Sequence, residues 1–254
     1  MSGPLLEAEA VSKRFSGIVA LSDVSLHVAD GEFVAVIGPN GAGKSTLFNC
    51  LSGVLRPDRG TVTFRGRSLE RLRPSARARL GIARTFQRIE LFGGMTVLDH
   101  LLVADRARTR RGGLWSDLFR GSRPTSEELE RCGIVLELVG LTEWADRPAE
   151  SLSLGKGRLV ELARALMCDP ALLFLDEPSS GLDRHETAEM SATLETVSRQ
   201  HGTAIVLIEH DVPMVRRLAE RTYVLDYGQL IADGPTEDVL GDERVRVAYL
   251  GDNS

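Results

Sequence analysis

A glycine-rich segment between two apolar segments holds the residues best suited to chemistry. It meets the pattern G-x-x-x-x-G-K-[ST] through four residues, Gly38, Gly43, Lys44 and Ser45. The apolar run 34–37 before it predicts a buried strand, and the residues from Lys44 onward predict a helix. Glycines let successive backbone N–H groups converge on a phosphate, and the helix N-terminus adds further donors and a positive dipole. The lysine can reach the β- and γ-phosphates, while the serine hydroxyl can bind Mg²⁺.

This pattern predicts a loop that binds the phosphates of a nucleotide. Its predicted contacts are nine consecutive residues: Gly38, Pro39, Asn40, Gly41, Ala42, Gly43, Lys44, Ser45 and Thr46. Phe15 lies among polar neighbours closer to the N-terminus. It fits either the edge of a small sheet or an exposed ring on which a base stacks.

Two adjacent carboxylates follow another apolar run. Residues 171–175 predict a fully buried parallel strand, which leads directly into Asp176 and Glu177. Carboxylates at the mouth of a buried strand are costly unless something compensates their charge. Because neighbouring residues of a strand point to opposite sides, we expect Asp176 to face a metal ion and Glu177 another ligand, such as a water.

Further polar residues stand where predicted core strands end or a predicted helix begins. Gln87 ends a short strand, His210 follows a buried one, and Ser153 and Gly155 lie in a polar loop before a helix over 159–166. Each has an ordinary structural interpretation, since such a serine is usually a helix cap. The loop can also be a second anion-binding terminus. The strand-end residues group where open α/β sheets bind ligands, at the carboxyl ends of parallel strands.

Arginines concentrate in two segments. Those spaced through 69–80 predict a solvated helix face. Those between 106 and 123 surround Trp115 and Phe119, which predicts a solvated insertion or, alternatively, a contact with a membrane surface or a partner. Residues 96–145 lack the alternation of strands and helices, so we expect a helical insertion in an α/β core.

Composition limits the class of protein. The chain has 254 residues, enough for one domain or a core with a smaller subdomain, and a net charge of −5, which argues against bulk nucleic-acid binding. Three cysteines far apart fit no metal spacing and predict buried thiols in a reducing compartment. Neither a leader peptide nor a membrane span is predicted, so we expect a soluble cytoplasmic protein.

Taken in order, these motifs resemble the nucleotide-binding subunit of an ABC transporter over nearly the whole chain. The matching positions are the stacking aromatic Phe15, the Walker A loop 38–45, the Q-loop Gln87, the signature segment 152–156, the Walker B strand 172–176, the catalytic Glu177, the D-loop 180–183 and the switch histidine His210. The resemblance implies a single ABC ATPase domain over 1–254. Its fold would be an α/β P-loop NTPase (RecA-like) core with an N-terminal antiparallel β subdomain, over about 1–87 and 159–254, and an inserted helical signature subdomain over about 88–158.

The resemblance also implies the machinery. Two such subunits would sandwich two ATP molecules with Mg²⁺, and each site would take Ser153 and Gly155 from the second subunit. Ser45, Gln87 and Asp176 would bind the metal. Glu177 would polarise the attacking water, with His210 and Gln87 completing the catalytic set. The implied partners are a second ATPase subunit (identical or a paralogue), two transmembrane permeases and, indirectly, a solute-binding protein, at the cytoplasmic face of the membrane and without nucleic acid.

Within the family, the context of Gln87 and the long insertion after Ala104 look like the branched-chain amino-acid importer class. ATPases of urea/amide importers and of lipopolysaccharide export are the alternatives. A non-transport ABC ATPase usually carries two nucleotide domains or a long coiled coil, and this chain has neither. Glu177 and His210 disfavour a module that binds ATP without hydrolysing it. The transported solute is not encoded in these residues.

The signature segment departs from the family consensus at two positions. Leu154 replaces a glycine and Lys156 replaces a glutamine. A cation near a helix N-terminus is disfavoured by the helix dipole. We therefore expect Lys156 to weaken closure of the dimer unless a nearby nucleotide compensates its charge.

Overall fold

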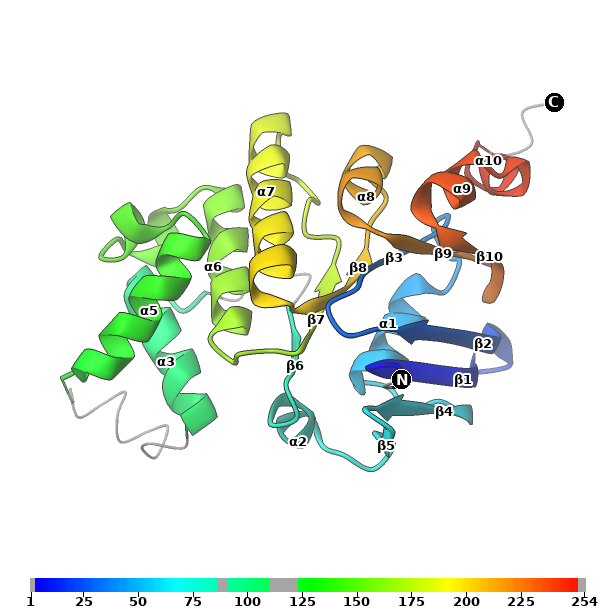
Figure 1. Ribbon diagram of the computed structural model, residues 1–254, viewed down its shortest axis with the longest axis horizontal. Helices are drawn as coiled ribbons and strands as arrows, with labels where there is room; N and C mark the ends of the chain where they lie inside the picture. The colour runs from blue at the N-terminus through cyan, green and yellow to red at the C-terminus, as the bar shows by residue number, and fades with distance from the viewer. Residues whose placement is uncertain (1–2, 86–90, 110–122, 251–254) are drawn as a thin grey trace.

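Two β-sheets and the helices packed against them make up the fold of the computed structural model (Figure 1). The structure describes residues 3–85, 91–109 and 123–250. No helix within these ranges is long and apolar enough to cross a membrane.

The central sheet has six strands in the order β10-β9-β3-β8-β7-β6. They are β3 (Phe33–Ile37), β6 (Ile82–Arg84), β7 (Leu172–Asp176), β8 (Ala204–Ile208), β9 (Arg221–Asp226) and β10 (Gln229–Pro235). All neighbours run parallel except the hairpin of β9 and β10. The predicted strands at 34–37 and 171–175 are therefore confirmed, as is the buried strand predicted before His210.

The second sheet is antiparallel, in the order β2-β1-β4-β5. Its strands are β1 (Leu6–Phe15), β2 (Ile18–Val28), β4 (Arg59–Phe64) and β5 (Arg67–Ser68). Figure 1 shows these strands beside α1, below the central sheet in that view. The expected antiparallel N-terminal sheet is present.

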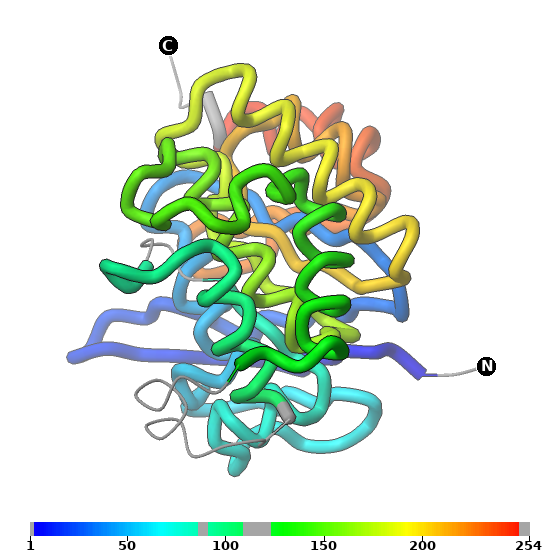
Figure 2. The backbone as a smooth tube through the Cα atoms, turned by 90° about the vertical axis from the view of Figure 1, so that its left-hand side faces the viewer, coloured from blue at the N-terminus to red at the C-terminus, as the bar shows by residue number. Residues whose placement is uncertain are grey.

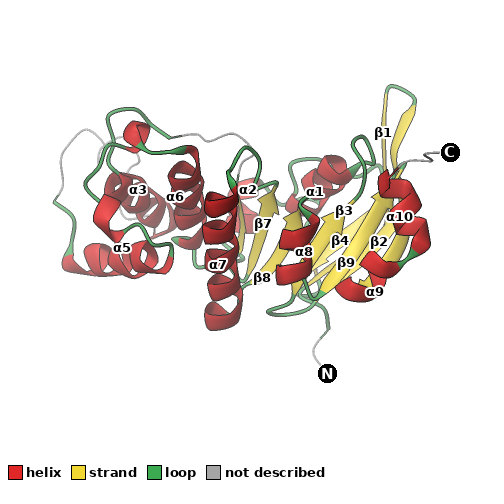
Figure 3. Ribbon diagram, turned by 90° about the horizontal axis from the view of Figure 1, so that it is seen from above, coloured by secondary structure: helices red, strands yellow, loops and turns green. Residues whose placement is uncertain are grey.

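Helices pack on both faces of the central sheet and also form a group at one end of the molecule. They are α1 (Lys44–Ser52), α2 (Pro74–Ala78), α3 (Val97–Thr109), α5 (Ser126–Leu138), α6 (Leu154–Leu166), α7 (Arg184–His201), α8 (Val212–Leu218), α9 (Thr236–Gly241) and α10 (Glu243–Leu250), with single turns at Thr142–Trp144 and Ala149–Ser151. The helices α3, α5 and α6 group at one end, the end that faces the viewer in Figure 2. Figure 3 shows this helical end on one side and the strands on the other.

The C-terminal segment from Thr236 to Leu250 forms two helices rather than one. The chain is extended at Asp242 (φ −68°, ψ 127°), between α9 and α10. Its carboxylate accepts the backbone N–H of Arg244 at 2.9 Å, which satisfies a donor at the start of α10. Asp242 thus separates α9 from α10.

The central strands separate two hydrophobic cores. Leu172 and Phe174 of β7 face the core shared with α1 and the antiparallel sheet, while Leu173 and Leu175 face the core under the other helices. The ring of Phe174 meets that of Phe48 edge-on, with centroids 5.3 Å apart. Burying each such side chain contributes ~1.5–3 kcal/mol. Burial on both faces explains why these strands are continuous apolar runs rather than alternating ones.

One arginine corrects the expectation of a solvated face over 69–80. Arg77 is buried, and its guanidinium donates to the carbonyls of Leu51, Leu69 and Leu72. The carbonyl of Leu51 is in the last turn of α1, where it lacks a partner within the helix. The other arginines of this segment are not buried.

The three cysteines are free thiols, as predicted. Cys50 and Cys132 are buried and Cys168 is half-buried. Burial raises the pKa of Cys50 and of Cys132 to about 11. Such thiols are poor nucleophiles near neutral pH.

A buried histidine anchors the loop before α3. His100 is 1% exposed; its Nδ1 lies 2.8 Å from the carbonyl of Thr96, and its Nε2 accepts the backbone N–H of Phe92 at 2.9 Å. This pair of contacts requires the neutral ring with the proton on Nδ1. Burial lowers the pKa of His100, and nearby Arg164 acts in the same direction.

The lowered pKa of His100 makes the stability of the fold depend on pH. Because the folded pKa is lowered, the unfolded chain binds a proton that the folded chain does not. We expect the free energy of unfolding to be highest above the ordinary histidine pKa of about 6.5 and to fall as pH drops below it, by up to ~1.4 kcal/mol per pH unit from this residue. Urea titrations at several pH values give the free energy of unfolding at each pH. Between about pH 6.5 and 5 this free energy should depend less steeply on pH in His100→Gln than in wild type. An equal dependence on pH in the two proteins would contradict this account.

Candidate functional site

The phosphate loop is held between a strand of each sheet. A Cβ at Gly38 would collide with the carbonyl oxygen of Leu225 in β9, and one at Gly43 would lie 2.5 Å from the carbonyl oxygen of Ala20 in β2. Both glycines have positive φ, 151° and 101°. Only glycine satisfies both requirements, so these two positions fix the loop against the sheets.

Lys44 occupies the inside of this loop. Its Nζ donates to the carbonyls of Gly38 at 2.7 Å and Pro39 at 2.9 Å. Burial lowers the pKa of Lys44, while the charges of Glu177 and Asp176 act in the opposite direction. Phosphate oxygens are better acceptors for an ammonium group than neutral carbonyls. The ammonium group of Lys44 is therefore held by two acceptors that a phosphate oxygen could replace.

The other loop residues offer backbone donors and hydroxyls. Asn40, Gly41 and Ser45 are exposed, and Thr46 is half-buried. The Ser45 hydroxyl stands in the first turn of α1, which begins at Lys44.

Phe15 ends β1 and pairs with Ile18 across the hairpin. It is 43% exposed, and Nζ of Lys13 lies 5.7 Å from its ring centroid. The ring is thus at the edge of a sheet and also open, as base stacking requires. The hairpin contacts the phosphate loop through Ala20.

Asp176 ends β7 and is 5% exposed. Its Oδ1 is buried and, among the described residues, has no hydrogen-bond partner, while Oδ2 lies 4.0 Å from Nη2 of Arg84. Burial raises the pKa of Asp176, and Arg84 partly opposes that shift. Buried carboxylate oxygens normally have a donor or a metal ion. This Oδ1 is therefore suited to act as a ligand of a cation.

Glu177 lies outside the strand, unlike the sequence-based expectation. The strand ends at Asp176, and Glu177 adopts φ +48°. Its N–H donates to the carbonyl of Ile208 at 2.9 Å, and its own carbonyl accepts from Ser180 at 3.0 Å. Strand alternation therefore ends at Asp176, and the backbone turn at Glu177 sets the direction in which its side chain leaves the chain. Non-glycine residues at positive φ cost ~1–3 kcal/mol and cluster at functional sites.

The residue before His210 was missed by sequence reasoning. Glu209 is fully buried and accepts three backbone N–H groups, from Ser179 at 2.9 Å, His210 at 2.9 Å and Asp211 at 3.2 Å. It therefore ties the loop after Glu177 to the loop of His210, whose side chain is 60% exposed. The available signal was an acid directly after a buried strand, the same pattern that drew attention to Asp176.

The polar loop at 151–157 is partly helical. The helix predicted over 159–166 begins five residues earlier, at Leu154, with Ser153 as its N-cap. The Ser153 hydroxyl accepts the backbone N–H of Lys156 at 3.3 Å. The cap fixes the start of the helix, and glycines inside the first turns do not prevent it.

Two acidic residues of α7 contact this helix start. Oε1 of Glu186 accepts from the Ser153 hydroxyl at 2.9 Å and from the Gly155 N–H at 3.2 Å. Nζ of Lys156 lies 3.2 Å from Oε2 of Glu189. The charge of Lys156 thus has a partner within the chain.

Leu154 is the other departure from the signature consensus. It is 43% exposed, and a Cβ at Gly181 would lie 3.0 Å from its Cδ2. The leucine side chain therefore leans over Gly181, and the absence of a side chain at that position gives it room.

The predicted residues form two separate groups. Lys44, Asp176 and Glu177 interact electrostatically and share one location at the carboxyl end of the central strands. Ser153 and Gly155 contact α7 instead. The helix α1 packs in the core on one face of the sheet, whereas α6 packs in the core on the other. A single chain therefore presents the two groups at different places.

Some predictions lie outside the described residues. These include Gln87 and most of the arginine-rich segment. Of that segment, Arg106 pairs with Glu128 at 2.8 Å and lowers the pKa of that carboxyl to about 2. Arg106 is therefore held in an ion pair rather than freely solvated.

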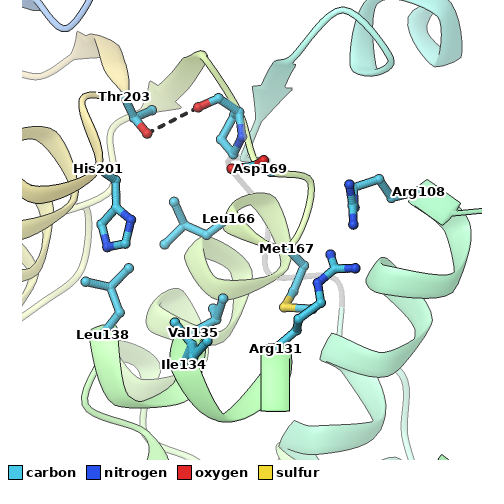
Figure 4. Close-up of a pocket in the computed structure, with 11 residues that line it drawn as sticks. Arg108, Arg131, Ile134, Val135, Leu138, Leu166, Met167, Asp169, His201 and Thr203 are labelled. Carbon is cyan, nitrogen blue, oxygen red and sulfur yellow. Dashed lines mark hydrogen bonds between the residues drawn. The ribbon is translucent and has the colours of Figure 1, made fainter. Parts of the chain in front are cut away.

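A cavity of about 260 Å³ lies at the other end of the strands (Figure 4). Asp169 and Thr203, which line it, precede β7 and β8. Figure 4 shows Arg108 and Arg131 on one side of the cavity and His201 on the other. None of the predicted site residues that the structure describes lines this cavity, so it is separate from the candidate site formed by them.

Comparisons with known proteins support the family that the ordered motifs indicated. Residues 21–180 match the sequence profile described as "ABC transporter", and residues 229–253 match that described as "Branched-chain amino acid ATP-binding cassette transporter". The chain is 42% identical to the high-affinity branched-chain amino acid transport ATP-binding protein LivG of Salmonella typhimurium, over 99% of this chain and 100% of that protein. It is 38% identical to BraF of Pseudomonas aeruginosa, with the same coverage.

The fold is also similar to solved structures of ATP-binding cassettes. A nucleotide-free ATP-binding cassette from an ABC transporter superposes with a TM-score of 0.84 at 32% identity, covering 98% of this chain and 100% of that one. The ADP conformation of an ATP-binding cassette gives 0.86 at 33% identity, with the same coverage.

Glu209 yields a stability prediction. In Glu209→Gln, the amide NH₂ group must face at least one of the backbone donors that now meet carboxylate oxygens. A buried donor without an acceptor costs ~1–3 kcal/mol. We expect urea unfolding to show a loss of that size. Glu195→Gln is the matched control, because Glu195 makes surface ion pairs worth ~0–1 kcal/mol. Equal losses in the two variants would contradict the buried role of Glu209.

Proposed function

The chain belongs to the ABC transporter family of ATP-binding cassettes, and from that premise we propose that it energises an importer of branched-chain or related amino acids. The family membership makes it an ATPase subunit. One observation carries the proposal: similarity to branched-chain amino acid transport ATP-binding proteins extends over 99% of the chain. The profile match at 229–253, described by the name of the same importer class, supports this proposal.

Nucleotide binding follows from the loop geometry. In this proposal the adenine stacks on the open ring of Phe15, and the phosphates meet the backbone donors of residues 38–46. Lys44 leaves the carbonyls of Gly38 and Pro39 and takes the β- and γ-phosphates. The dipole of α1 favours the same negative charge.

Mg²⁺ fits the residues present. Ser45 and Asp176 would hold it, with Gln87 as the third predicted ligand. The buried Oδ1 of Asp176, which has no hydrogen-bond partner within the described ranges, supports this role. Mg²⁺ usually takes only one or two carboxylates and completes its shell with waters and phosphates, so no larger acidic cluster is needed. When bound, it neutralises charge on the phosphate oxygens.

Hydrolysis needs an oriented water. Glu177 follows Asp176 directly, and its backbone turns where the strand ends. We assign it the water, and His210 the γ-phosphate. Glu209 would hold both loops in register through its three backbone contacts.

A second ATPase subunit would complete each site. Ser153 and Gly155 lie on α6, across the sheet from α1, so one chain does not bring them to its own phosphate loop. A sandwich of two chains, identical or paralogous, would bring them to the partner's nucleotide. The motion would be passed to two transmembrane permeases, with a solute-binding protein supplying the amino acid. The subunit would act as a peripheral protein at the cytoplasmic face of the membrane.

Glu177→Gln tests the catalytic assignment. Replacing the carboxylate removes its ability to polarise water, and such groups contribute ~10²–10⁴-fold to rate. We expect phosphate release to fall by at least ~100-fold while ATP binding, measured by fluorescent-nucleotide displacement, is kept. Turnover at the wild-type rate would remove Glu177 from this role. Absence of turnover in the wild-type chain with its copurified partners would favour a non-hydrolysing module.

Uptake tests the solute class. Deletion of this chain from its host should abolish high-affinity uptake of leucine, isoleucine and valine, and restoring the wild-type chain should recover it. Urea uptake should be unchanged. Unchanged leucine uptake with loss of urea uptake would overturn the solute assignment but not the ATPase assignment.

A further inference from the structure

The N-terminus of α6 already holds a carboxylate of its own chain. Oε1 of Glu186 accepts from the hydroxyl of Ser153 at 2.9 Å and from the N–H of Gly155 at 3.2 Å. The approach is close, because a Cβ at Gly155 would lie 2.6 Å from the carboxyl carbon of Glu186. The two donors assigned to a phosphate are therefore both engaged by a negatively charged group.

The same side chain also caps α7. The Asp183 carboxylate accepts the N–H of Glu186 at 2.8 Å, and Oε2 of Glu186 accepts the N–H of Asp183 at 3.4 Å. One carboxylate thus serves the positive ends of two helices, with an oxygen toward each. One turn further along α7, Glu189 pairs with Lys156, which links the same two helix starts a second time.

We propose that Glu186 occupies the phosphate-binding end of α6 and must leave it when the γ-phosphate of a partner's ATP arrives. This rests on the proposed function, since it requires a second nucleotide-loaded subunit. A phosphate and a carboxylate cannot share Ser153 and Gly155, because two anions at one pair of donors repel each other. Glu186 holds these groups in a binding-ready arrangement while the chain is free.

The displacement gives Glu186 a specificity role. A nucleotide without a γ-phosphate brings no group to these donors, and so nothing replaces the carboxylate. Glu186 thereby makes closure of the two-subunit dimer less favourable unless the bound nucleotide is a triphosphate. It is a positioning residue, because it acts through Ser153 and Gly155.

A purely structural cap predicts a different outcome for Glu186→Gln. The glutamine carbonyl oxygen can still accept from Ser153 and Gly155, but it carries no charge to oppose a phosphate. If Glu186 only stabilises the helix starts, the substitution weakens α7 and does not favour association. If its carboxylate competes with the γ-phosphate for Ser153 and Gly155, the substitution makes ATP-dependent association tighter although the free chain is no more stable.

The test measures ATP-dependent association of the full chain, with itself or with its copurified ATPase partner, by light scattering. Glu177→Gln serves as the background, so that ATP persists. We expect Glu186→Gln to tighten association by about fivefold or more. The matched control is Glu195→Gln, which removes the same charge from α7 at a residue paired with Arg199 and Arg217 and should leave association within about twofold. Unchanged or weaker association in Glu186→Gln, or equal tightening in the control, would overturn the proposal.

A second measurement examines the contact without any dimer. In the nucleotide-free chain, the Gly155 amide should exchange with solvent about tenfold faster in Glu186→Ala than in wild type, because an N–H in the first turn has no partner within its helix. Equal exchange would overturn the contact. Failure of the proposed function would give a different result. In that case no variant, including one with Glu186 intact, would associate with a second subunit when ATP is added.

Discussion

Backbone N–H groups that lack a partner at helix starts are the constraint on which this site depends. The first turns of α1, α6 and α7 each present such donors, and each must meet an anion or a side-chain oxygen. At α7 the acceptors are Asp183 and Glu186 of the same chain. At α6 they are Ser153 and, again, Glu186. At α1 the N-cap is Gly43, which has no side chain to accept, so the loop is left suited to a phosphate.

Buried acids at neighbouring strand ends show how the same residue class takes two roles. Glu209 follows β8 and accepts three N–H groups, so its charge is satisfied by the protein alone. Asp176 ends β7 next to it, and its Oδ1 has no partner among the described residues. The first arrangement fixes loops, and the second is suited to a cation. Sequence alone does not separate them, because both are an acid after an apolar strand.

The sequence predicted what depends on local pattern. Strands 34–37 and 171–175 were recognisable because burial on both faces produces unbroken apolar runs. The ordered motifs identified the family, since each motif is a short segment. What escaped prediction depends on contacts between distant residues. Ser153 meets Glu186 across 33 positions, and Arg77 reaches Leu51 across 26. Such pairs follow from how α6 packs on α7, or α2 beside α1, which no local pattern reports.

Lys156 illustrates how packing changes the meaning of a sequence departure. Considered alone, a cation in the first turn of α6 opposes the helix dipole and predicts a weakened phosphate site. In the structure Glu189 lies 3.2 Å away on the facing turn of α7, so the pair is neutral and joins the two helices. Glu186 lies one turn earlier on that same face. When a phosphate displaces the Glu186 carboxylate, the Lys156–Glu189 pair still holds α6 against α7. The departure from consensus thus gives α6 and α7 a second polar contact that does not involve Glu186.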